Sequence, residues 1–140
     1  MNWFLWAVLA AMVWGVAPLI EKTGLRNTPP MAGLFFRSVG VAIGLALLGI
    51  FVVKPQEIRS VEPRSALLLM TGGFVASIIG QTFFYNGLKV GEVSRMVPIS
   101  GSYPFVAFIL GVLIMGESVT LLKVAGALLI VLGVLLLKIG

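Results

Sequence analysis

The sequence predicts an all-α, polytopic membrane protein with five transmembrane helices. Of its 140 residues, 59% are hydrophobic and 11% are charged, whereas soluble domains have roughly 45–50% apolar and about 25% charged residues. A soluble fold could not bury so much apolar surface. The apolar residues fall into five runs, each close to the roughly 20 residues with which a helix crosses the hydrocarbon core of a bilayer.

The five runs and their connections account for the chain, so we expect a single transmembrane domain over residues 1–140. The helices are expected at about residues 3–20, 31–53, 66–87, 96–115 and 121–138. The short connections between them hold nearly all the charge and much of the turn-forming Gly, Pro and Ser.

The first helix has the length of a membrane span. A cleaved signal peptide is the alternative, but it would need a basic segment before the apolar run, and the first two residues carry no Lys or Arg. The pair Trp14-Gly15 and Pro18 indicate a locally irregular helix. Irregular backbone at membrane depth is tolerated only where it faces protein or a water-filled cavity, so we expect Trp14 to line a cavity.

Two charged residues are expected at or inside the membrane. Glu21 is expected to end the first helix, where a half-buried carboxylate could carry protons; the alternative is an interfacial Glu beside Lys22. Arg37 lies about two turns into the second helix, on a face that also carries Gly33 and Gly40 and could admit a neighbouring helix. Arg37 either faces a cavity, pairing there with an anionic substrate or with Glu21, or snorkels to the membrane surface.

The third helix carries a polar stripe of residues spaced four apart, Ser77, Gln81 and Tyr85, with Asn86 beside it. Residues at this spacing share one face of a helix. Two interpretations stay open. The stripe lines a cavity, or it forms interhelical hydrogen bonds, which stabilise a bundle only modestly.

Two prolines fall in the fourth helix. Pro98 is expected in its first turn, where a missing N–H costs little. Pro104 is expected deeper, where it leaves the Ser100 carbonyl without its usual donor. That carbonyl and the side chains of Ser100 and Tyr103 would make a polar wall for a binding site. The alternative is a packing kink whose polar groups bond to neighbouring helices.

The last helix places Gly126 and Gly133 seven residues apart, on one face. Small residues let helices approach closely, so we expect this face to pack two protomers together. The alternative is a lipid-facing helix with incidental glycines.

The chain contains no His, no Cys and no Asp. This excludes most metal sites, catalytic triads, thiol chemistry and haem ligation, and we expect neither an enzyme nor a cofactor or metal site. The net charge of +5 is spread over short segments, which is typical of interfacial anchors rather than of a nucleic-acid surface.

The charge balance across the membrane is nearly even. With five spans, the N-terminal side carries four Lys or Arg residues and the other side five, or six with Arg37. Because Lys and Arg are enriched on the cytoplasmic side, this small excess favours an external N-terminus. If the excess has no effect, the chain inserts in both orientations, and one sequence could then supply both halves of an inverted-repeat transporter.

Taken together, these segments resemble the EamA-type branch of the drug/metabolite transporter superfamily, over nearly the whole chain. The resemblance rests on the motifs WG and IEKTGL, LFFRS, YNGLKVGEVSRMVPISGSYPF and GESVTLLKVAGALLIVLGVLLL. The segment GALLIVLGV is also similar to the last-helix glycine pair of the small multidrug resistance proteins, which pack as antiparallel dimers through it.

The resemblance implies one five-helix repeat of an inverted-repeat, ten-helix transporter fold, working as an antiparallel homodimer. It implies a secondary transporter, often an exporter, of a small organic metabolite or drug, acting by alternating access. We expect it in the cytoplasmic membrane of a prokaryote. The small multidrug resistance proteins carry a proton-coupling Glu in the middle of their first helix. This chain has no acid there, and Glu21 cannot simply inherit that role.

The residues expected to form the site lie in the predicted helices, and those expected to line the cavity have polar or aromatic side chains. The cavity residues are Trp14, Arg37, Ser77, Gln81, Tyr85, Ser100 and Tyr103, with possible coupling by Glu21 and helix breaks at Pro18, Pro98 and Pro104. A second hypothesis is a non-transporting membrane subunit, either a scaffold for a partner protein or a lipid-binding accessory. It predicts stoichiometric co-purification with a partner and no flux by the chain alone.

Overall fold

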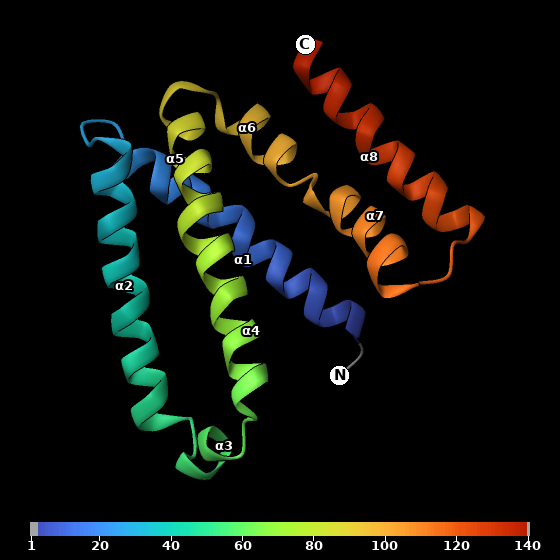
Figure 1. Ribbon diagram of the computed structural model, residues 1–140. Coiled ribbons are helices and arrows are strands. Elements are labelled where there is room, and N and C mark those ends of the chain that lie inside the picture. Colours follow the sequence, from blue (N-terminus) through green and yellow to red (C-terminus); the bar gives the residue numbers. More distant parts are fainter. Residues whose placement is uncertain (1–2, 140) are drawn as a thin grey trace. The chain divides into compact units, whose positions relative to one another are not determined.

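The computed structural model describes residues 3–139, and throughout this part of the chain the regular secondary structure is helical (Figure 1). Five helical segments are long and apolar enough to cross a membrane. They are Phe4–Gly24, Pro30–Phe51, Pro63–Val90, Val93–Met115 and Leu121–Ile139. The predicted all-α fold with five spans is therefore confirmed.

The chain forms two compact units, one of Met1–Leu19 with Gly91–Gly140 and the other of Ile20–Val90. Helix α1, Trp3–Gly24, begins in the first unit and ends in the second. Pro18 lies inside this helix and does not break it, so the prediction of a break there is wrong. A proline removes a single backbone hydrogen bond, and helices in lipid tolerate this because neighbouring groups satisfy the freed carbonyl.

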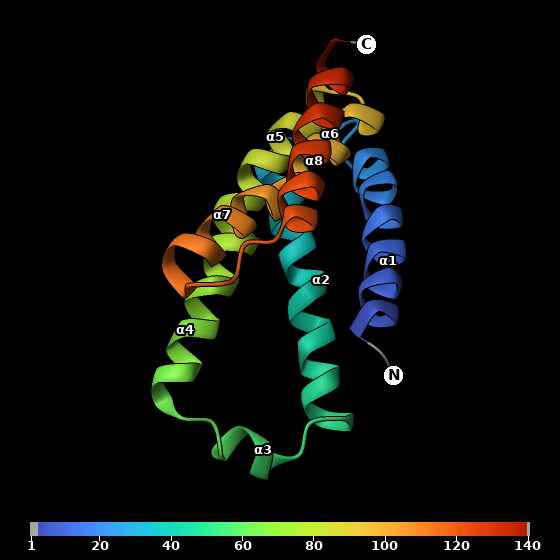
Figure 2. The same cartoon turned by 90° about the vertical axis from the view of Figure 1, so that its right-hand side faces the viewer.

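In the Ile20–Val90 unit, α2 (Pro30–Phe51) lies beside the third span, and the short helix α3 (Pro55–Arg59) connects them (Figures 1 and 2). The third span consists of α4 (Pro63–Phe74), the π-helical segment η1 (Val75–Gly80) and α5 (Gln81–Val90). Helices α2, α3 and α4 all begin with a proline, whose missing N–H costs nothing in the first turn.

The π-helical segment changes the geometry of the polar stripe. In a π-helix the hydrogen bonds run from residue i to i+5, so residues four apart do not stack as they do in an α-helix. Ser77 lies in η1, whereas Gln81 and Tyr85 lie in α5. The four-residue spacing therefore defines one regular α-helical face only from Gln81 onward.

In the other unit, α8 (Leu121–Ile139) contacts both α6 (Val93–Ser100) and α7 (Tyr103–Met115) (Figure 2). The fourth span is thus two helices. The predicted break at Pro104 is present, because α6 ends at Ser100 and Pro104 lies in the first turn of α7. Pro98 lies in the interior of α6 and not in its first turn, so that part of the prediction is wrong. The reason is that α6 begins at Val93, earlier than expected.

The buried apolar core is small. It comprises Leu25, Leu34, Tyr85 and Leu88 in the Ile20–Val90 unit, and Ala127 in α8. Most large apolar side chains along the spans are exposed. Since lipid tails are as apolar as these side chains, such exposure costs nothing in a bilayer.

Candidate functional site

A cluster of polar side chains forms where the end of α1 meets α2 and α5. Helix α1 continues to Gly24, and the Leu25 amide donates to the Glu21 carbonyl at 2.9 Å. Glu21 therefore lies inside the first span and does not end it, which corrects the predicted helix end. The side chain of Glu21 is 19% exposed, so its carboxylate is largely withdrawn from the surface.

Gly33 lets α2 approach α5 and the end of α1. A Cβ atom placed on Gly33 would lie 2.6 Å from Leu25 Cδ2 and 3.3 Å from Tyr85 Cε1. At these distances the Leu25 side chain would have to shift before Gly33 could carry a side chain. A Cβ atom placed on Gly40 or Gly44, farther along α2, would meet no neighbouring atom within 4 Å. Of these three glycines, only Gly33 is needed for the close contact.

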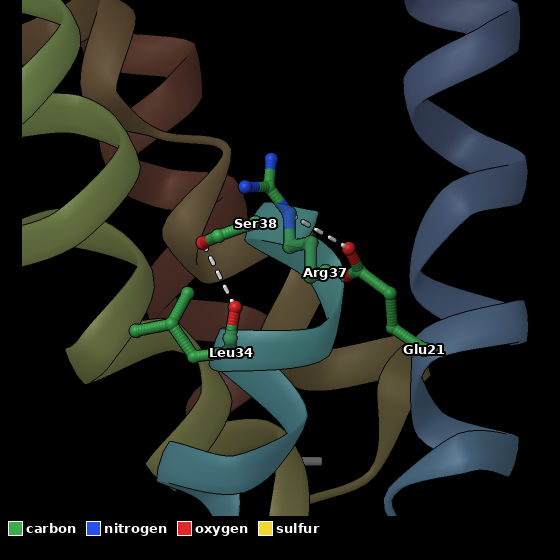
Figure 3. Close-up of polar contacts among 4 residues, drawn as sticks. All are labelled: Glu21, Leu34, Arg37 and Ser38. Carbon is green, nitrogen blue, oxygen red and sulfur yellow. Dashed lines mark hydrogen bonds and ion pairs between the residues drawn. The ribbon is translucent and has the colours of Figure 1, made fainter. Parts of the chain in front are cut away.

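Arg37 pairs with Glu21 (Figure 3). The Arg37 Nε atom donates to Glu21 Oε1 at 3.2 Å, and the Arg37 side chain is 28% exposed. Figure 3 shows the two terminal nitrogens of Arg37 pointing away from Glu21. The sequence left several alternatives open for Arg37, and in the structure Arg37 forms the pair with Glu21.

Tyr85 completes this cluster from α5. Its side chain is 2% exposed, and its phenol lies close enough to the Glu21 carboxylate and to Arg37 to interact with both electrostatically. A tyrosine hydroxyl buried in an apolar span usually finds a polar partner. One carboxylate, one guanidinium and one phenol, from three different helices, thus meet within the spans.

The other members of the stripe lie in different surroundings. Gln81 is half-buried, and its Oε1 atom is buried without a hydrogen-bond partner among the residues that the structure describes. Ser77 is exposed. Asn86 is also exposed, and its side-chain amide donates to the Thr82 carbonyl of its own helix at 2.7 Å. The members of the stripe thus differ in exposure, and their place in a cavity wall stays a prediction.

The remaining predicted site residues belong to the other unit. Trp14 on α1 and Tyr103 at the start of α7 are 64% and 58% exposed. The Ser100 hydroxyl donates to the Val97 carbonyl at 3.0 Å, and the Ser102 hydroxyl donates to the Ile99 carbonyl at 2.7 Å. Both serines thus bond to carbonyls of α6 beside the break, while Pro104 offers no N–H to the Ser100 carbonyl.

Two lysines form a reciprocal contact that the sequence analysis missed. The Lys22 ammonium, near the end of α1, donates to the carbonyls of Leu88 and Lys89 at the end of α5. The Lys89 ammonium donates in return to the carbonyls of Leu25, Arg26 and Thr28, just after α1. We call this arrangement the lysine clasp. Its sequence signal is a basic residue in the last turn of each helix, where a cation is favoured by the helix dipole.

Within residues 3–139, no three His, Cys, Asp or Glu residues are grouped so that they could hold a metal ion. The polar cluster has instead a chemistry of ion pairing and hydrogen bonding. Its carboxylate and its guanidinium can each leave the other and bind a different partner. Charged groups inside membrane spans commonly mark the path of a substrate or proton.

The five spans and the charges within them define a multi-pass membrane protein. The EamA-like transporter family matches residues 1–139, so the chain belongs to that family, whose members are membrane transporters. The family resemblance found in the sequence is confirmed.

Individual relatives agree with this assignment. The chain is 27% identical over 136 residues to an uncharacterised protein of Methanocaldococcus jannaschii, and the aligned region covers 95% of this chain and 93% of the relative. It is 25% identical over 138 residues to an uncharacterised transporter of Sinorhizobium, covering 99% of this chain and 97% of the relative. A "probable amino-acid metabolite efflux pump" of Salmonella typhimurium is 26% identical, over 95% of this chain but 47% of the pump. No solved structure matches the chain significantly.

Proposed function

We propose that the protein is a secondary transporter that exports a small organic metabolite or drug by alternating access, and that Glu21, Arg37 and Tyr85 lie on its substrate path. The observation that carries the proposal is the Glu21–Arg37 pair inside two membrane spans. Family membership supports transport as the activity. The relatives named above come from an archaeon and from bacteria, which supports a location in the cytoplasmic membrane of a prokaryote.

Hydrogen-bond donors of the cluster that are not used for the ion pair support a role in binding. Arg37 uses Nε for Glu21, and its terminal nitrogens point away from that carboxylate (Figure 3). Helix α5 contacts α2 with Tyr85 against Gly33. The two helices run in opposite directions (Figures 1 and 2). We therefore expect Arg37, one turn further along α2, to lie at the same level as Gln81, one turn back along α5.

Both residues have polar groups that could bind a ligand. Arg37 offers donors in a planar fork that suits a carboxylate or another planar anion. Gln81 offers an acceptor, Oε1, that is buried and unpaired within the described part of the chain. A buried polar atom without a partner is costly, and a polar substrate that bonded to it would recover that cost.

We propose that Glu21 acts as an exchangeable partner in the transport cycle. A substrate anion that binds Arg37 displaces the Glu21 carboxylate, which then takes a proton or another cation. Release of the substrate restores the ion pair. Tyr85 lies beside both groups and would keep the displaced carboxylate hydrogen-bonded.

The transporting unit is proposed to be an antiparallel homodimer. Cβ atoms placed on Gly126 and Gly133 of α8 would meet no neighbouring atom within 4 Å, which leaves that face open to a second copy. Two oppositely inserted five-helix chains would provide the inverted repeats between which many transporters bind their substrates.

The proposal is tested by measuring flux in proteoliposomes with a panel of labelled amino-acid metabolites and with an anionic dye as a drug probe. The amino-acid probes are chosen because one relative is named as an efflux pump for them. We expect saturable flux of at least one probe. Arg37→Gln should lower this flux at least about tenfold, because it removes the charge offered to the substrate. Arg64→Gln, at the start of α4, is the matched control and should transport normally.

A charge exchange separates binding from folding. Arg37→Glu alone places two carboxylates together and should lower thermal stability, and the double variant Glu21→Arg with Arg37→Glu should restore it. The double variant should still lack flux if the position of the charge matters to the substrate. Normal flux in Arg37→Gln and in the double variant would remove the cluster from the substrate path. Absence of flux with every probe, together with stoichiometric co-purification of another protein, would favour a scaffold.

A further inference from the structure

A basic pocket lies beside the lysine clasp. It has a volume of about 220 Å³ and is lined by Lys22, Leu25, Arg26 and Lys89. Three of these four residues are cationic and none is acidic. The two helix ends that meet here carry roughly half a negative charge each from their dipoles, which offsets only part of the charge of the three cations. The pocket therefore favours an anion.

The three cations have different roles in the pocket. The Lys89 ammonium directs its three N–H donors at three carbonyls, and the Lys22 ammonium donates to two. Both lysines thus hold fixed positive charge in place. Arg26 is exposed, and its guanidinium has no hydrogen bond or ion pair with any residue in the described range. It is therefore the group with donors available to an incoming ligand, and its planar fork suits two oxygen atoms of a phosphate.

The position of the pocket indicates where such a phosphate could come from. Gly24 and Val90 are the last residues of the first and third spans, and the pocket residues lie within three positions of these ends. The lipid headgroups occupy a layer immediately outside the hydrocarbon core. Basic pockets between membrane helices at this depth suit the headgroups of anionic lipids.

The size of the pocket fits the same ligand. Its volume of about 220 Å³ is several times the roughly 30 Å³ that one water molecule occupies in the liquid, so it can admit a phosphate together with part of a glycerol. Leu25 is among the lining residues and gives the pocket an apolar part beside its three cations.

We infer that this pocket binds the phosphate group of an anionic phospholipid headgroup, with Arg26 as the hydrogen-bonding residue and Lys22 and Lys89 as fixed charges. Bound lipid would bridge the ends of α1 and α5 and brace the lysine clasp. The inference depends on the pocket alone and holds whether or not the protein transports the solutes proposed above.

The test is native mass spectrometry of the full chain in detergent, titrated with phosphatidylglycerol or with phosphatidylcholine of the same acyl chains. We expect the anionic lipid to bind about tenfold more tightly than the zwitterionic one. Arg26→Gln should remove most of that preference, and Arg26→Lys should keep part of it because the charge remains. Arg59→Gln, in the short helix α3, removes an equal charge elsewhere and should leave the preference unchanged.

Competition with inorganic phosphate separates the two sources of the same chemistry. If millimolar phosphate leaves phosphatidylglycerol bound, the ligand is a lipid; if it displaces the lipid through the Arg26-dependent site, the pocket is a phosphate site open to soluble anions as well. Equal affinity for the two lipids would overturn the inference. So would a preference that survives Arg26→Gln, in a variant whose circular dichroism and melting temperature match those of the parent chain.

Discussion

At the scale of single residues, two charged side chains lie inside membrane spans, where charge is costly. Arg37 and Glu21 lie in membrane spans, and each compensates the charge of the other at 3.2 Å. An unpaired charged side chain at the centre of a membrane helix costs roughly 2.5–3.5 kcal/mol on insertion scales; Glu21 and Arg37 lie away from the centres of their spans, so the penalty for either one is smaller. The pair thus allows both charges to stay inside the bundle, where they are available to a substrate.

Gly33 lies where α2 comes close to Leu25 and Tyr85. Gly33→Ala should lower the free energy of unfolding by about 1–3 kcal/mol, the usual cost of overpacking. Gly40→Ala, on the same helix in open space, should be neutral or should stabilise the helix by up to about 1 kcal/mol. Thermal or denaturant unfolding in detergent, followed by circular dichroism, measures both. Equal stability of the two variants would mean that the close approach at Gly33 is not required.

At the scale of helices, the lysine clasp joins two helix ends that lie more than sixty residues apart in the chain. The last carbonyls of a helix have no partner within the helix. Near a membrane surface, where water is scarcer, a lysine from the neighbouring helix is an effective donor. The clasp therefore fixes the end of α1 against the end of α5 and holds Glu21 and Tyr85 at the same level.

Removing one half of the clasp tests this role. Lys89→Met leaves the carbonyls of Leu25, Arg26 and Thr28 without their charged donor. We expect the free energy of unfolding to fall by about 1.5–3 kcal/mol, the range for a hydrogen bond to a charged group. Lys123→Met removes an exposed lysine that bonds to the Ser118 carbonyl alone, and should change stability by less than about 0.5 kcal/mol. If the free energy of unfolding fell as much in the control as in Lys89→Met, the clasp would contribute no more to stability than an exposed lysine.

The break between α6 and α7 is a second feature at the scale of helices. Within the fourth span, Pro98 sits inside α6 and Pro104 opens α7. Beside the break, the Val97 and Ile99 carbonyls accept from the Gly101 and Ser102 amides and also from the Ser100 and Ser102 hydroxyls. The hydroxyls thus add to existing backbone bonds, and Pro104 still offers no N–H to the Ser100 carbonyl.

At the scale of the whole molecule, the orientation in the membrane decides which mechanism is open to it. The chain has no cysteine, so single cysteines can be labelled without background. Ser60, at the end of α3, and Asn27, between α1 and α2, are both exposed and lie in connections on opposite sides of the membrane. An impermeant thiol reagent applied to intact cells should label Ser60→Cys and Asn27→Cys each in part, because the charge bias is weak. Full labelling of one position and none of the other would establish a single orientation and contradict an antiparallel dimer of this chain.

The association of two copies can be tested on α8. Gly126→Leu and Gly133→Leu fill a face that is open within one chain, so we expect them to leave the fold intact and to lower the dimer fraction about tenfold. Gly44→Leu, on an equally open face of α2, should leave the dimer unchanged. Cross-linking in native membranes and analytical ultracentrifugation in detergent measure the fraction. If all three variants associate alike, the glycine face of α8 is not the interface.

The sequence alone determined the class of the protein and the number of its spans. These features depend on local properties, because the length and hydropathy of each run decide whether that run can cross a bilayer, whatever the rest of the chain does. The family followed in the same way, from motifs along the chain. The presence of Arg37 inside a span was also evident, as was its possible pairing with Glu21.

The tertiary structure decided which of the polar residues meet. The continuation of α1 past Glu21, the close approach at Gly33 and the lysine clasp all depend on contacts between residues distant in the chain, which no local pattern specifies. The same holds for the stripe of the third helix, because a single π-helical segment separates Ser77 from Gln81 and Tyr85. Local hydropathy places helices in the membrane, but only packing between helices brings one carboxylate, one guanidinium and one phenol together.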